Sequence, residues 1–284
     1  LRPLNEPFLQ TVSDSDKATI VDIGRKSHYQ CGQLSPSWTG GLELLNLRKE
    51  IYTKTPEIGQ RSNFWEDKHS TNAHILYYGY DKVALDVQTE VLRELETIYL
   101  ENPDYFTRRI SYIEALLQYA DVLHRNGQSV EALTELDKLD LEIGKALEVS
   151  PKFVKSKLLS VKGNILRAKI HQKRNHMDDA LLAINKAEMA MPEIYEGSPI
   201  AEHQFVHLQI QIVKGQILFA KNGFDDLDAQ NRILTSHTEL TKLQSENKLF
   251  PPYNQLLADT QFMLGQEQIT LDRLVLSEQE LVAF

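Results

Sequence analysis

Residues 103–151 read PDYFTRRISYIEALLQYADVLHRNGQSVEALTELDKLDLEIGKALEVSP. A proline stands at each end of this stretch, 48 positions apart, and Pro199 follows after another 48. Two further series keep the same interval: Gly79, Gly127, Asn175 and Gly223, and Ala84, Ala132 and Ala180. Self-similarity at a fixed period is typical of proteins built from stacked structural repeats.

The stretch itself predicts a pair of helices. Proline suits the first turn of a helix but not its interior, so Pro103 and Pro151 mark helix boundaries. Apolar residues recur at helical spacing over 113–123 and again over 132–146. Between them, Asn126-Gly127 breaks the pattern, and glycine just past a helix end supplies a left-handed cap. Each repeat is therefore predicted to be two antiparallel helices of about five or six turns.

Neighbouring stretches repeat this layout. Residues 161–169 (VKGNILRAK) and 213–221 (VKGQILFAK) share seven of nine residues at an offset of 52, which indicates duplication with a small slip in register. Residues 41–55 are predicted to be the second helix of an incomplete leading pair, and Pro251-Pro252 to start a last pair. Small residues at repeated positions predict close helix crossings: Ala84, Ala120, Ala132, Ala168, Ala180 and Ala258.

Residues 1–40 do not follow the repeat and are predicted to be an irregular segment or linker, with the repeat domain over 41–284. A short β-branched run at 18–23 is compatible with one strand, and 35–41 is predicted to be a loop before the first helix. The chain opens without methionine, so we expect a fragment or a processed form.

The motif Tyr119-Ala120-Asp121-Val122-Leu123-(x)3-Gly127-(x)4-Ala132-Leu133 resembles the tetratricopeptide repeat, whose usual length is about 34 residues. A period of 48 is similar to the long-helix variants of bacterial signalling proteins, which often sit behind a kinase, a protease-like domain or a DNA-binding domain. The resemblance implies an all-α right-handed superhelix of about five antiparallel helix pairs. It further implies that the first helix of each pair lines a concave groove.

Composition narrows the class of function. The net charge of −9 and the pI near 5.5 argue against nucleic acid as the principal partner. No apolar run is long enough to cross a membrane, so membrane insertion is not expected. One cysteine, Cys31, excludes an internal disulfide framework and a four-cysteine zinc site, and we favour a cytoplasmic location. Phosphate-binding, dinucleotide-binding, kinase and serine-nucleophile motifs are missing, so we expect neither an enzyme nor a cofactor.

Charge is unusual in one place, because residues 152–174 hold eight basic residues and no acidic one. On a helix, Lys162, Lys169 and Lys173 lie close to one side, and the resemblance implies that such lysines can clamp an acidic peptide in the groove. Asp121 and Arg125, on the preceding first helix, complete the candidate partner-binding residues. A solvated basic face remains the alternative, paired with the acidic helix before it.

Two other groups of residues, a histidine pair and an aromatic cluster, give weaker signals. His203 and His207 are four apart on a predicted helix, but without an evident third ligand we interpret them as surface or interface histidines and expect no metal site. Tyr77, Tyr78 and Tyr80, with Phe64 and Trp65 nearby, indicate either an aromatic contact patch or packing of the N-terminal segment.

We therefore expect a protein- or peptide-interaction scaffold within a larger bacterial signalling or regulatory protein. Its partner would be a protein, an acidic peptide or another domain of the same parent chain. The alternative is a ligand-sensing or effector domain of a transcription regulator or kinase.

Overall fold

The computed structural model describes residues 34–54, 57–77, 79–195, 201–246 and 253–266, and these form helices joined by short turns. The chain divides into an N-terminal unit, residues 1–160, and a C-terminal unit, residues 161–284. The predicted strand at 18–23, Cys31, Tyr78 and most of the last predicted helix pair lie outside the described residues.

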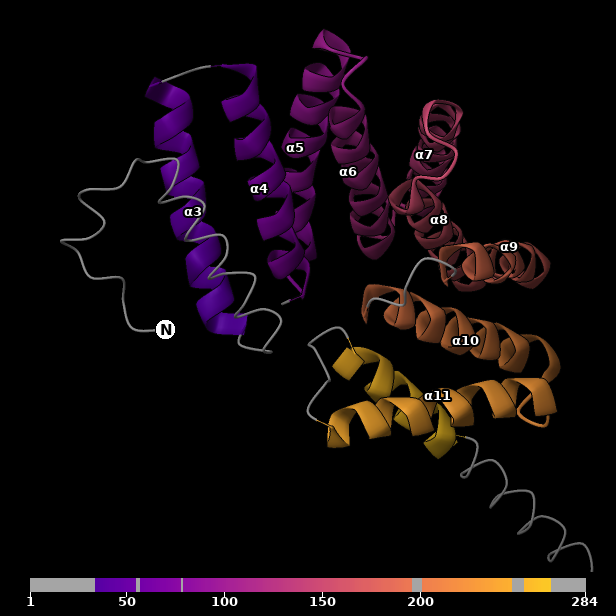
Figure 1. Cartoon of the computed structure of the whole chain (residues 1–284). Coiled ribbons are helices and arrows are strands. Elements are labelled where there is room, and N and C mark those ends of the chain that lie inside the picture. Colours follow the sequence, from indigo (N-terminus) through magenta and orange to yellow (C-terminus); the bar gives the residue numbers. More distant parts are fainter. Residues whose placement is uncertain (1–33, 55–56, 78, 196–200, 247–252, 267–284) are drawn as a thin grey trace, which may run out of the picture. The chain divides into compact units, whose positions relative to one another are not determined.

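The N-terminal unit is a row of helices in which each packs against the next (Figure 1). In order they are α3 (Leu34–Lys54), α4 (Ile58–Tyr77), α5 (Asp81–Glu101), α6 (Phe106–Arg125) and α7 (Ser129–Val149), followed by the first turns of α8 (Val154–Lys173). One aromatic anchor among its described residues is Trp65, which is buried against Val91, Leu95 and Ile98. Pairs α4–α5 and α6–α7 are the helix pairs that the sequence predicts.

The C-terminal unit continues in the same manner. It holds the rest of α8, then α9 (Met177–Tyr195), α10 (Ala201–Asn222), α11 (Leu227–Ser245) and a further helix over 253–266. Helix α10 packs on both α9 and α11. Tyr253 anchors the last helix, because it is almost fully buried in a core with Leu208, Ile233 and Leu240. The all-α architecture of antiparallel pairs is confirmed.

Three of the turns explain the period of 48. Gly79, Gly127 and Asn175 each adopt a left-handed conformation, with φ of 76°, 83° and 62°. In each turn, the N–H of the next residue donates to the carbonyl five positions earlier: Tyr80 to Ile75 (3.2 Å), Gln128 to Leu123 (2.9 Å) and His176 to His171 (2.9 Å). This pattern is the Schellman motif, which caps a helix and reverses the chain at once. The two glycines and the asparagine therefore form the turns at which the chain reverses within successive helix pairs.

Small residues at the repeated positions are buried, as predicted. Ala84, Ala120, Ala132, Ala168 and Ala180 are all 0% exposed. Ala258 differs, because it is exposed in the helix over 253–266, so its predicted place at a close crossing is wrong for the described part of the chain.

Ala132→Leu should lower the free energy of unfolding by about 1–3 kcal/mol, because a larger side chain must be accommodated where α7 packs on α6 with no free space. Urea unfolding measures the change. Thr134→Leu is the control, since Thr134 is exposed on the same helix and should change stability by less than about 0.5 kcal/mol. Equal effects of the two substitutions would contradict close packing at Ala132.

The predicted loop over 35–41 is wrong, because α3 already begins at Leu34. Pro36 and the glycine pair at 40–41 suggested a loop. Pro36, however, falls in the first turn of α3, where the missing N–H has no helical partner to lose. The predicted second helix of the leading pair therefore starts earlier than expected.

The first complete pair departs from the repeat in its core. Asn72 and Gln88 are buried on α4 and α5, 48 residues before Ala120 and Leu136. The amide of Asn72 donates to the Ala84 carbonyl (3.1 Å) and to the Gln88 side chain (3.0 Å). Gln88 in turn donates to the Ala115 carbonyl of α6 and contacts His69 Nδ1. Burial lowers the pKa of His69 to about 4, although its hydrogen bond with Gln88 acts in the opposite direction.

Candidate partner-binding surface

The basic stretch on α8 contacts acids on other first helices. In the N-terminal unit, Lys155 pairs with Glu114 of α6 (2.9 Å). In the C-terminal unit, Lys162 pairs with Glu202 of α10 (2.5 Å). The predicted alternative, pairing with the acidic helix before α8, is therefore not what these two lysines do. Ion pairs between partly exposed side chains contribute little stability, so these two pairs neutralise lysine charges but do little to stabilise the fold.

The five predicted site residues are divided between the two units, with Asp121 and Arg125 in the N-terminal unit and the three lysines in the C-terminal unit. Asp121 and Arg125 pair with each other on α6 (3.0 Å). Arg125 also lines an open hollow of the N-terminal unit beside Tyr80 and Asp81. Lys169 is partly buried on α8, whereas Lys173 is exposed in the last turn of the same helix. Lys162 pairs with Glu202, whereas Lys173 is exposed at the end of α8 and is therefore well placed to meet a partner.

A second hollow lies in the C-terminal unit and is lined mainly by first helices. We call it the first-helix hollow; its volume is about 450 Å³, and it is open to solvent. Its lining comes from the end of α8, from α10 and the turn after it, and from the helix over 253–266: Gln172, Gln216, Phe219, Ala220, Phe224, Asp259, Phe262 and Met263.

The chemistry of this hollow is apolar with a polar rim. Phe219 is buried and its ring packs against Phe224 (centroids 5.2 Å apart), whereas Phe262 is 68% exposed. Gln172, Gln216 and Asp259 add amide and carboxylate groups. Gln172 is three residues after Lys169, so these two side chains share one face of α8. An apolar side chain could fill the floor while polar groups meet its backbone.

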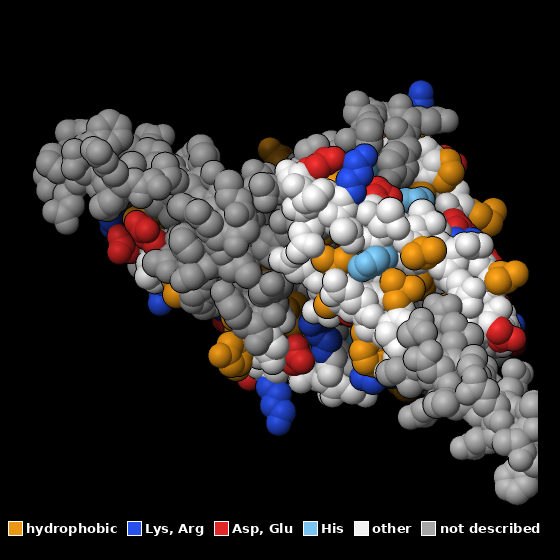
Figure 2. Space-filling view, turned by 90° about the horizontal axis from the view of Figure 1, so that it is seen from below, with side chains coloured by type: hydrophobic (Ala, Val, Ile, Leu, Met, Phe, Trp, Pro, Cys, Tyr) orange, Lys and Arg blue, Asp and Glu red, His pale blue; other side chains and the backbone are white. Residues whose placement is uncertain are grey.

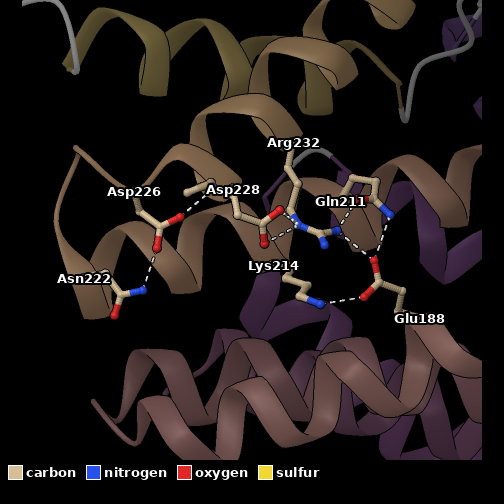
Figure 3. A network of polar contacts seen from close by, with 8 residues as sticks. Glu188, Gln211, Lys214, Asn222, Asp226, Asp228 and Arg232 are labelled. Atoms are coloured by element: carbon tan, nitrogen blue, oxygen red, sulfur yellow. Dashed lines mark hydrogen bonds and ion pairs between the residues drawn. The ribbon is translucent and has the colours of Figure 1, made fainter.

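A polar network joins α10, which lines this hollow, to α9 and α11 (Figure 3). Glu188 of α9 accepts hydrogen bonds from Lys214 of α10 (2.6 Å) and Arg232 of α11 (2.7 Å), and Gln211 bonds to both Glu188 and Arg232. Burial raises the pKa of a carboxyl group, but the bonds from Lys214 and Arg232 outweigh burial and lower the pKa of Glu188 to about 2. The network therefore stays ionised at neutral pH and joins three helices.

The face seen in Figure 2 shows hydrophobic side chains scattered among polar ones, with basic and acidic groups interspersed over the atoms drawn in colour. Such a mixed surface is ordinary for a protein exterior. The coloured atoms of this face therefore do not form a broad surface of one kind.

The remaining predicted features have different outcomes. His203 is only 5% exposed on α10, so a surface location is wrong for it, whereas His207 is partly buried. Trp65 belongs to the core, and Phe64 packs edge-on against it (centroids 5.0 Å apart). Among the described aromatics near the first turn, Tyr80 is the exposed one, at 63%.

Sequence reasoning missed the first-helix hollow. Its residues lie on three helices separated by up to 91 positions, so no local motif joins them. The one local signal was Phe262, a large apolar residue on a helix whose apolar stripe is formed by Tyr253, Leu256 and Leu257.

No protein-family model matches the sequence, and no curated protein matches it. Among solved structures, the chain is similar to a Rap protein complexed with competence and sporulation factor, at 14% identity and a TM-score of 0.56. The match covers 94% of this chain and 67% of that chain. This likeness supports a tetratricopeptide-like helical-repeat fold. In the described residues, no helix is long and apolar enough to span a membrane.

Proposed function

We propose that this chain is a non-catalytic scaffold that binds a segment of another protein on its first-helix face. The observation that carries the proposal is the first-helix hollow, which exposed Phe262 and buried Phe219 both line, together with Gln172 of the basic helix α8. Aromatic side chains in desolvated pockets supply much of the affinity of protein interfaces. Lys169 and Lys173 would select segments that carry acidic residues next to an apolar anchor.

The shape of the hollow favours a protein segment over a small ligand. Pockets for small molecules enclose most of the ligand surface, whereas this hollow is open to solvent. The similar Rap protein was also solved with a bound factor, which agrees with a binding role for this fold.

We further propose that the chain belongs to a larger bacterial signalling or regulatory protein. The bound segment would come from a partner or from another domain of the parent chain.

Selection from a random peptide display library tests the proposal. Peptides enriched on the wild-type chain should share an apolar anchor flanked by acidic residues. Phe262→Ser should weaken their binding by about tenfold or more, because it removes an interface anchor worth more than about 1.4 kcal/mol. Lys169→Glu/Lys173→Glu should weaken binding further at low salt, and high salt should reduce that difference.

Matched controls lie on second helices of the same unit. Leu234→Ser removes an apolar residue of α11 that is 55% exposed, and Lys186→Glu/Lys242→Glu reverses two exposed charges on α9 and α11. Both controls should bind as the wild type does. Binding that Phe262→Ser leaves intact, or that Leu234→Ser reduces equally, would contradict a site at the first-helix hollow.

A further inference from the structure

Two histidines and an aspartate come together at the turn between α8 and α9. His171 lies in the last turn of α8, His176 directly precedes α9, and Asp179 lies in the first turn of α9. Asp179 Oδ2 is 3.9 Å from His171 Nδ1 and 3.8 Å from His176 Nδ1. One ligand atom from each residue falls within 4.8 Å of the other two, and the imidazole rings are stacked with centroids 6.1 Å apart.

The backbone of the turn produces this arrangement. Asn175 adopts a left-handed conformation, and the N–H of His176 donates to the carbonyl of His171 (2.9 Å). The chain thus reverses between the two histidines, which brings side chains five positions apart onto one side of the turn. The equivalent turns of the N-terminal unit place Ile75 and Tyr80, and Leu123 and Gln128, at these positions, so the histidine pair is particular to this turn.

His171 has an unused nitrogen that faces the cluster. Its Nδ1 is buried and has no hydrogen-bond partner among the described residues. Burial lowers the pKa of His171; Asp179 acts in the opposite direction, and His176, Arg167 and Arg174 lower it further. A neutral imidazole has a lone pair on one of its two nitrogens, and in the tautomer protonated at Nε2 that lone pair is on Nδ1, where a metal ion requires it.

The two separations between a histidine nitrogen and the aspartate oxygen are close to those of a metal site. With bonds of about 2.0–2.1 Å in tetrahedral geometry, two ligand atoms lie about 3.3 Å apart. The observed 3.8 and 3.9 Å between nitrogen and oxygen exceed this by about half an ångström, a difference that side-chain rotation at an exposed turn can close. Imidazole and carboxylate ligands suit Zn²⁺ and neighbouring transition metals better than Ca²⁺ or Mg²⁺.

We propose that the α8–α9 turn binds a Zn²⁺-class transition-metal ion through Nδ1 of His171, Nδ1 of His176 and the carboxylate of Asp179, with water completing the coordination. This proposal does not depend on partner binding at the first-helix hollow. It departs from the expectation that the chain has no metal site. The sequence did not predict this site, because the spacing His-x4-His-x2-Asp crosses a helix end and matches no single-helix motif. The ion would join the end of α8 to the start of α9.

Isothermal titration of the metal-free whole chain with Zn²⁺ tests the site, with Co²⁺ as a spectroscopic probe of coordination. The wild type should bind one ion at this site, with Co²⁺ absorption typical of nitrogen and oxygen ligands, and Zn²⁺ should raise the melting temperature. His176→Ala and Asp179→Asn should each lose at least about 100-fold in affinity, since even changes beyond the direct ligands cost about 10–100-fold. Both residues are exposed, so these variants should fold.

Asp178→Asn is the matched control. Asp178 neighbours Asp179 on the same turn of α9, but its carboxylate pairs with Lys221 (2.6 Å) and is 90% exposed. This variant should bind Zn²⁺ with the affinity of the wild type. Affinity unchanged in His176→Ala and Asp179→Asn, or no saturable binding of Zn²⁺ at sub-millimolar concentration, would overturn the proposal.

Discussion

Gln88→Ala should lower the free energy of unfolding of the N-terminal unit by about 3 kcal/mol. Gln88 is 0% exposed and joins three helices, since it accepts from Asn72, donates to the Ala115 carbonyl and contacts His69. Its truncation leaves buried polar groups without partners, at about 1–3 kcal/mol, and adds a cavity. Both effects destabilise the packing of α4, α5 and α6 against one another.

The repeat itself supplies the rescue variant. Asn72 and Gln88 occupy the positions that Ala120 and Leu136 hold in the next pair, and both of those are fully buried. Asn72→Ala/Gln88→Leu should therefore recover most of the lost stability, because replacing both partners by apolar groups can be nearly neutral. The amide pair would then be a polar substitution into a crossing that is otherwise apolar.

Intrinsic fluorescence is a suitable measurement, because both tryptophans, Trp38 and Trp65, lie before residue 160. Urea unfolding at pH 7 should shift to lower denaturant for Gln88→Ala and return toward the wild type for the double variant. A Gln88→Ala variant as stable as the wild type would show that the buried network contributes nothing. A double variant less stable than Gln88→Ala would contradict the equivalence of the two helix pairs.

The comparison of sequence and structure is most informative at these same positions. Gly79, Gly127 and Asn175 were readable from the sequence, because a capping turn needs a left-handed residue at a fixed place in every repeat. The role of Gln88 could not be predicted from the sequence, because a polar residue inside an apolar stripe is explained only by its hydrogen-bond partners on α4 and α6. Periodic features are local and repeat, whereas departures from the period depend on packing between helices.

The candidate site shows the same division. The lysines of α8 stood out as a run of charge, yet the structure engages Lys155 with α6 and Lys162 with α10. The first-helix hollow and the cluster at the α8–α9 turn form only when helix ends meet. His171, His176 and Asp179 are near in sequence, but their convergence requires the left-handed Asn175 between them.

Glu188→Ala should lower the stability of the C-terminal unit by about 2–3 kcal/mol. The substitution leaves Lys214 and Arg232, which are 14% and 19% exposed, without the carboxylate that each contacts. Hydrogen bonds to charged groups contribute about 1.5–3 kcal/mol, and an unpaired, largely buried cation is costly. Asp228→Asn is the control, because its pair with Arg232 is 58% exposed on the carboxylate side and should change stability by less than about 0.5 kcal/mol.

The pH dependence identifies the charge of Glu188 as the cause. The folded state lowers the pKa of Glu188 to about 2 from a usual value near 4.5, so its contribution is complete above about pH 4.5 and is lost as pH falls toward 2. The stability difference between the wild type and Glu188→Gln should thus be constant from pH 7 to 5 and shrink below pH 4.5. Hydrogen exchange followed by mass spectrometry places the effect, which should appear as faster exchange in α9, α10 and α11. A difference that persists unchanged at pH 3 would show that the shape of the side chain, and not its charge, holds these three helices.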